Sequence, residues 1–183
     1  LVGSEMCIRD SFTVDLPGAF SLKGGGILEN LTDSLTRSGT IGLDMVTRNL
    51  NFLTGLTGVT PDGSLVIPGS MSLKMKMEMN GPQYKAKLDL KEGKGSMNVN
   101  AALNSSTEVY TADLKINDLQ LHHFLPKDSI YELSLSADAK GRGLDVMSFH
   151  SLANLNLSLD QLHYARYHLS NCLLYTSPSP RDI

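Results

Sequence analysis

The chain has 183 residues, 41% of them hydrophobic and 19% charged, with a formal net charge of −3 at pH 7. No basic patch stands out and Trp is absent, so a nucleic-acid groove lined with stacking aromatic side chains has little support. No apolar run approaches the roughly 18 residues that a membrane-spanning helix needs.

The two ends of the chain resemble translated sequencing adapter. Leu1–Ser11 and Cys172–Asp182 match translations of the two strands of a common transposase adapter, with Ile183 as the following codon. We therefore expect residues 1–11 and 172–183 to be foreign, and residues 12–171 to be an interior fragment of a repeating β-groove domain. Both cysteines lie in the terminal segments, so residues 12–171 contain none.

The N-terminal part of this interior segment is compatible with two structures. Residues 20–26 alternate as a strand does, which favours a strand that runs to about Asn30. However, Ile27, Leu31 and Leu35 also fall at the i, i+4 and i+8 spacing of a short amphipathic helix. The helix therefore remains an alternative over this stretch.

From Ser70 onward, apolar and polar residues alternate with a period of two, which predicts strands with one apolar face. Turns of two to six residues, such as Gly81-Pro82, join these segments and predict an antiparallel meander. The apolar rows are Met71, Leu73, Met75, Met77 and Met79; Tyr84, Ala86, Leu88 and Leu90; Met97, Val99, Ala101 and Leu103; Tyr110, Ala112, Leu114 and Ile116; Tyr131, Leu133, Leu135, Ala137 and Ala139; and Ala153, Leu155, Leu157 and Leu159.

The alternation slips by one residue at three places. The slips at residues 116–119 and 159–162 are alike, and residues 45–50 show a looser version. An extra residue of this kind predicts a β-bulge. The recurrence suggests a weak internal repeat, with coincidence among Leu-, Asn- and Asp-rich strands as the alternative. Residues 49–56 and 119–125 could each close a helical turn, and Pro126 would end the second.

A meander with one apolar face needs a cover, because each buried Leu or Met side chain is worth roughly 1.5–3 kcal/mol. A second sheet, closure into a barrel or lipid could supply it. Four methionines in the row from Met71 to Met79 suit a surface that accepts varied apolar partners. A Met-rich sandwich core explains the same row equally well.

The residues that could serve in catalysis or metal binding do not form a recognisable site. His122 and His123 are adjacent and should point apart, and so should His163 and His168, which differ by an odd number. The glycine-rich stretches 24–26 and 141–143 lack a following helix with phosphate-loop spacing. We therefore expect no enzyme activity, no catalytic residues, no cofactor and no metal site.

Several stretches resemble the TamB family of envelope proteins, which is related to the AsmA-like group of bacteria with two membranes. They are residues 20–56, with Leu31-Thr-Asp-Ser34 and Asn49-Leu-Asn-Phe-Leu53; Tyr110–Ser129; Leu133–Gly143; and Leu162–Tyr167. The resemblance covers essentially all of residues 12–171, although its motifs are patterns of side chains and not catalytic signatures.

The resemblance implies an all-β fold, an elongated antiparallel meander curved into an open, β-taco-like groove with one or two short helical turns. It implies a periplasmic protein, anchored in the inner membrane, of the translocation and assembly module. Its partners would be phospholipid acyl chains and the outer-membrane assembly machinery, with no nucleic acid. Its roles would be lipid transport, protein secretion and outer-membrane biogenesis.

On this basis we expect sixteen residues to line a lipid groove. They are Met71, Leu73, Met75, Met77, Met79, Leu88, Leu90, Val99, Leu103, Leu114, Ile116, Leu133, Leu135, Leu155, Leu157 and Leu159. Two alternatives remain, a structural or adhesin-like β-sandwich without lipid and a segment of an outer-membrane β-barrel. The second should show aromatic girdles at the strand ends, and the chain has few aromatic residues to form them.

Overall fold

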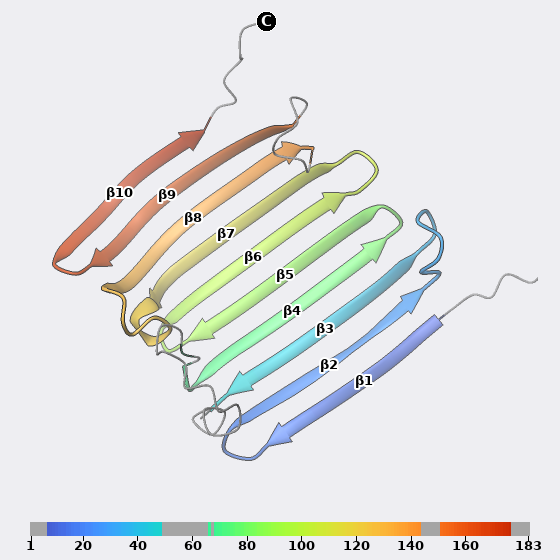
Figure 1. Ribbon diagram of the computed structural model, residues 1–183, viewed down its shortest axis with the longest axis horizontal. Helices are drawn as coiled ribbons and strands as arrows, with labels where there is room; N and C mark the ends of the chain where they lie inside the picture. The colour runs from blue at the N-terminus through green and yellow to red at the C-terminus, as the bar shows by residue number, and fades with distance from the viewer. Residues whose placement is uncertain (1–6, 49–65, 67, 144–150, 177–183) are drawn as a thin grey trace, which may run out of the picture.

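The computed structural model describes residues 7–48, 66, 68–143 and 151–176, which form one ten-stranded antiparallel sheet (Figure 1). Each strand lies beside the next one in the sequence, as the short turns predict for the segments from Ser70 onward, and the sheet does not close on itself. The strands are β1 (Cys7–Leu16), β2 (Phe20–Glu29), β3 (Ser38–Thr47), β4 (Met71–Asn80), β5 (Gln83–Glu92), β6 (Gly95–Asn104), β7 (Val109–Gln120), β8 (Ile130–Arg142), β9 (Leu152–Tyr164) and β10 (Tyr167–Thr176).

The register aligns the apolar positions of neighbouring strands into rows that cross the sheet. One row passes from β2 to β9 through Leu22, Met45, Leu73, Leu90, Met97, Ile116, Leu135 and Leu159. Directly opposed side chains on one face are the contacts that stabilise a sheet, so each such row fixes the register of its strands.

The stretch with two possible structures is a strand. β2 pairs with β1 on one side and with β3 on the other along its whole length. A helix at Ile27 would break both ladders. Gly26 also requires the absence of a side chain, because a Cβ there would lie 2.6 Å from the backbone oxygen of Thr40 on β3.

Two of the three predicted irregularities are confirmed as register shifts, and both lie beside Ser134 of β8. The register of β7 against β8 shifts between Ile116 and Leu119, and that of β8 against β9 shifts at Ser134. Asp118 adopts a positive φ of 46° at the first bulge. The buried Ser134 hydroxyl accepts a hydrogen bond from the Asp118 backbone N–H at 2.9 Å. The third irregularity extends into residues 49–53, outside the described residues.

The few buried side chains gather at one end of the sheet, where β1, β3 and β7 end and β2, β4 and β8 begin (Figure 1). Thr47 is 1% exposed, and its Oγ1 donates to Pro68 O at 2.9 Å and accepts from the Met71 N–H at 3.1 Å. The buried apolar side chains among the described residues are those of Ala19, Met71, Ile116 and Leu119. The rest of the apolar face has no protein layer over it in the described part of the chain.

One of the two predicted helical turns is present as a 3-10 helix, η1 (Leu121–His123), and the other lies outside the described residues at 49–56. Each outermost strand lies partly in a segment that resembles adapter. β1 begins in one and includes residues 7–11, and β10 ends in the other and includes residues 172–176. Cys7 and Cys172 are exposed free thiols.

Candidate functional site

All sixteen residues predicted to line a groove lie on the same face of the sheet. The strand register pairs Met75 with Leu88, Leu88 with Val99, and Val99 with Leu114, and the row continues through Ala137 to Leu157. Met71 and Ile116 are buried at the end of the sheet, so they support the face and are not accessible on it.

The remaining predicted residues are half-buried or exposed. Met77 is 42% exposed and Leu155 is 38% exposed, although both sit within rows of apolar neighbours. Ile41 and Phe12 extend the exposed apolar surface toward β1. Contiguous exposed apolar surface of this kind marks a site of interaction in soluble proteins.

A hollow in this face follows a row of small side chains that cross the strands. Ala86, Ala101 and Ala112 oppose one another on β5, β6 and β7, and Met77 on β4 continues their row. Larger side chains of the neighbouring rows flank them, so the alanines form the floor of a hollow of about 240 Å³. We define this feature, lined by residues 77, 84–86, 101–103 and 110–112, as the alanine hollow.

A single guanidinium lies at the rim of the alanine hollow. Arg37, just before β3, places its Cζ 5.2 Å from the centroid of the Tyr84 ring, and Tyr84 lines the hollow. The Arg37 Nε donates to Gly81 O at 3.3 Å. Among the described residues, no carboxylate lies within 4.0 Å of its side-chain nitrogens.

The turn that positions Arg37 is organised by a carboxylate. Asp33 Oδ1 accepts from the Leu35 N–H at 2.9 Å, and its Oδ2 accepts from the Thr36 hydroxyl at 2.9 Å. The Arg37 N–H donates to Asp33 O at 2.9 Å, and the Gly81 N–H donates to Arg37 O at 2.7 Å. One backbone bond and the Arg37 side-chain bond to Gly81 O therefore hold the turn against the β4–β5 hairpin.

Two hydrogen bonds lower the pKa of the Asp33 carboxyl below its ordinary value. The bond from the Leu35 N–H has the larger effect, and the bond from the Thr36 hydroxyl has the next largest. A lowered folded-state pKa stabilises the turn above the ordinary aspartate value, and that contribution is lost as the pH falls through the folded-state pKa. We expect an NMR titration to show the Asp33 side chain titrating below the usual aspartate range, with the Leu35 amide signal moving in the same step. Asp33→Asn should remove that step, and an ordinary aspartate titration would contradict the expectation.

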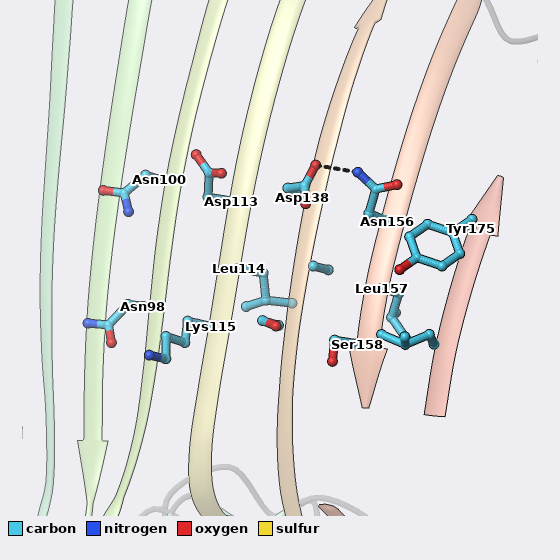
Figure 2. Close-up of a pocket in the computed structure, with 13 residues that line it drawn as sticks. Asn98, Asn100, Asp113, Leu114, Lys115, Asp138, Asn156, Leu157, Ser158 and Tyr175 are labelled. Atoms are coloured by element: carbon cyan, nitrogen blue, oxygen red, sulfur yellow. Dashed lines mark hydrogen bonds between the residues drawn. The ribbon is translucent and has the colours of Figure 1, made fainter. Parts of the chain in front are cut away.

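The opposite face of the sheet is polar and holds a wider hollow of about 680 Å³. Figure 2 shows Asn100, Asp113, Asp138 and Asn156 following one another across β6 to β9. Asn156 Nδ2 donates to Asp138 Oδ2 at 2.9 Å. Asp113 and Asp138 are directly opposed like charges, an arrangement that is tolerated where water solvates both. We interpret this face as the solvated back of the sheet.

The expectation that the histidines point apart is wrong for both pairs. His163 and His168 stack with ring centroids 4.0 Å apart, because they are cross-strand partners in the β9–β10 hairpin. The rings of His122 and His123, which are neighbours in η1, lie 4.1 Å apart and are tilted by 59°. His123 Nδ1 lies 2.7 Å from Glu92 Oε1, and the buried Glu92 Oε2 has no hydrogen-bond partner.

Within the described ranges, no group of three or more His, Cys, Asp or Glu side chains could hold a metal ion. No helix in the same ranges is long and apolar enough to cross a membrane. Comparison of the chain with family models, with curated proteins and with solved structures finds no match.

Proposed function

We propose that this chain is part of an envelope protein that offers phospholipid acyl chains an open apolar sheet along which to bind and move. The observation that carries the proposal is the set of apolar rows that cross the sheet from β2 to β9 without a protein layer over them in the described residues. The TamB resemblance supplies the setting, a periplasmic protein held at the inner membrane, with roles in lipid transport and in the assembly and secretion of outer-membrane proteins.

The chemistry of the face favours hydrocarbon over a peptide as its occupant. Inside the sheet, the backbone N–H and C=O groups of β2 to β9 are already paired with both neighbouring strands. A peptide laid across the face would find few partners there and would bury unpaired backbone groups, which costs free energy. An acyl chain has no such groups, and flexible Met side chains such as Met75 adapt to its position.

Photo-crosslinking at one position on each face tests the proposal. A benzoylphenylalanine replaces Met75 in one variant and its neighbour Lys74, which points to the polar face, in a second. Each variant is illuminated with vesicles of phosphatidylethanolamine and phosphatidylglycerol, and adducts are identified by mass spectrometry. We expect a phospholipid adduct at position 75 and none at position 74, because only the apolar face excludes water once hydrocarbon covers it.

Two results would contradict the proposal. Absence of lipid at position 75 would indicate that protein covers this face, as in a structural sheet without lipid. Equal labelling at positions 74 and 75 would indicate non-specific contact with the vesicle surface.

A further inference from the structure

We infer that the alanine hollow and Arg37 together form a seat for one phospholipid, with an acyl chain in the hollow and the phosphate on the guanidinium. This inference rests on the proposed function and adds to it a place on the sheet and a class of ligand. Its two parts are joined by Tyr84, which lines the hollow and carries Arg37 over its ring.

The hollow has the dimensions of a single hydrocarbon chain. Neighbouring strands lie about 4.8 Å apart, so the row from Met77 on β4 to Ala112 on β7 spans about 14 Å. Ala139 on β8 continues the row by one further strand. Side-chain rows on one face are about 6.6 Å apart along the strand, so one row of alanines between two rows of larger side chains leaves a trench for one chain.

The rows on the two sides of the alanines differ in a way that orients an occupant, and only the row of Tyr84, Leu103 and Tyr110 lines the hollow. Leu88 and Leu114 belong to the row toward the buried end of the sheet, whereas Tyr84 and Tyr110 belong to the row toward the other end. The Tyr110 ring covers Gly141 on β8, where a Cβ would collide with it. Tyrosine prefers a boundary between apolar and wet surroundings, so this second row marks the side on which a headgroup meets water.

The rim supplies a charge that complements a phosphate. The Arg37 Nε donates a hydrogen bond to Gly81 O, and within the described residues no carboxylate forms an ion pair with the guanidinium. The two terminal nitrogens of a guanidinium match two oxygens of one phosphate group. The nearest acidic side chain in the turn, Asp33, is committed to the Leu35 N–H and the Thr36 hydroxyl. Lipid phosphate therefore fits the rim while the attached chain enters the hollow past Tyr84.

The test uses the whole chain and two photoreactive lipids with the same acyl chains, each with a diazirine at one chain end. Phosphatidylglycerol carries the phosphate and diacylglycerol lacks it. We expect phosphatidylglycerol adducts to map to residues 101–112. Arg37→Gln should lower that labelling about tenfold and Arg37→Lys should restore most of it, while diacylglycerol labelling stays unchanged in both variants.

A matched pair of substitutions tests the hollow separately from the rim. Ala101→Phe fills the floor and should abolish labelling of the hollow by both lipids. Ala153→Phe adds the same ring to the same face on β9, outside the hollow, and should leave labelling unchanged. Circular dichroism shows whether each variant keeps its strands, and the two comparisons do not depend on each other.

The outcomes separate this inference from the function on which it rests. Adducts spread evenly over the apolar face, and insensitive to both Arg37→Gln and Ala101→Phe, would overturn the seat and leave the lipid-binding sheet standing. Absence of adducts from the apolar face would overturn both. Inorganic phosphate that shifts the Arg37 side-chain NMR signal at the concentration at which phosphatidylglycerol does so would identify a free-phosphate site and also overturn the seat.

Discussion

Leu119→Ala is expected to lower the free energy of unfolding by about 3 kcal/mol, whereas Leu88→Ala should lower it by about 1 kcal/mol. Leu119 is 4% exposed, at the bulge where β7 leaves the sheet for η1. Its removal leaves a cavity beside Gly95, whose backbone approaches Leu119 closely. Leu88 is half-buried on the open face, so its truncation removes contacts with neighbouring strands and leaves no enclosed cavity.

Urea unfolding followed by circular dichroism measures both losses, with the wild-type chain as the reference. The comparison also reports on the apolar face itself. Equal losses for Leu88→Ala and Leu119→Ala would mean that Leu88 is enclosed in the folded protein, and the open face proposed for lipid would then be covered. If Leu119→Ala lowers the free energy of unfolding by less than about 1 kcal/mol, the Leu119 side chain is not enclosed at the end of the sheet.

The sequence predicts most of this fold because a strand with one apolar face shows apolar and polar residues in alternation, which is visible in the sequence. Alternation alone locates β4 to β9, and short turns such as Gly81-Pro82 predict antiparallel neighbours, which the structure confirms. The slips at residues 116–119 and 159–162 predict bulges for the same reason. An extra residue is needed there to keep Leu119 and Leu162 on the apolar face, both opposite Leu133.

The features that the sequence does not reveal depend on which residues become neighbours across strands. Ala86, Ala101 and Ala112 are each an ordinary apolar position in their own segment, and only the register places them in one row. Arg37 lies in a turn, where a lone cation usually signifies solvation, and its position over Tyr84 depends on the β4–β5 hairpin. A search for small residues at equal distances from successive turns could have found the alanine row.

The histidine pairs show the limit of arguments from sequence spacing. Counting residues along one strand assigns His163 and His168 to opposite faces, but a hairpin between them restores both to one face. The Tyr164 to Tyr167 turn would have been the signal, because partners across an antiparallel hairpin with a two-residue loop differ by an odd number. Partners in the apolar rows of β4 to β7 also differ by odd numbers, which places those rows on one face.

The proposed lipid surface predicts a large loss of binding from one charge at its centre. Leu114→Asp places a carboxylate on the apolar face in the row of Leu88 and Val99. An aspartate in hydrocarbon costs about 2.5–3.5 kcal/mol, which corresponds to a weakening of phospholipid binding of about 100-fold. Vesicle flotation or fluorescent-lipid titration measures it.

The fold should tolerate this substitution because its site is open to water. A carboxylate on an uncovered face stays hydrated, so we expect the unfolding free energy to fall by no more than about 1 kcal/mol beyond the loss from Leu114→Ala. Ser136→Asp is the matched control, since it adds the same charge to the polar face opposite Lys115 and should leave lipid binding unchanged. If Leu114→Asp instead unfolds the chain, protein covers that position and the face is a core. If the variant folds and binds phospholipid as the wild type does, acyl chains do not use this face.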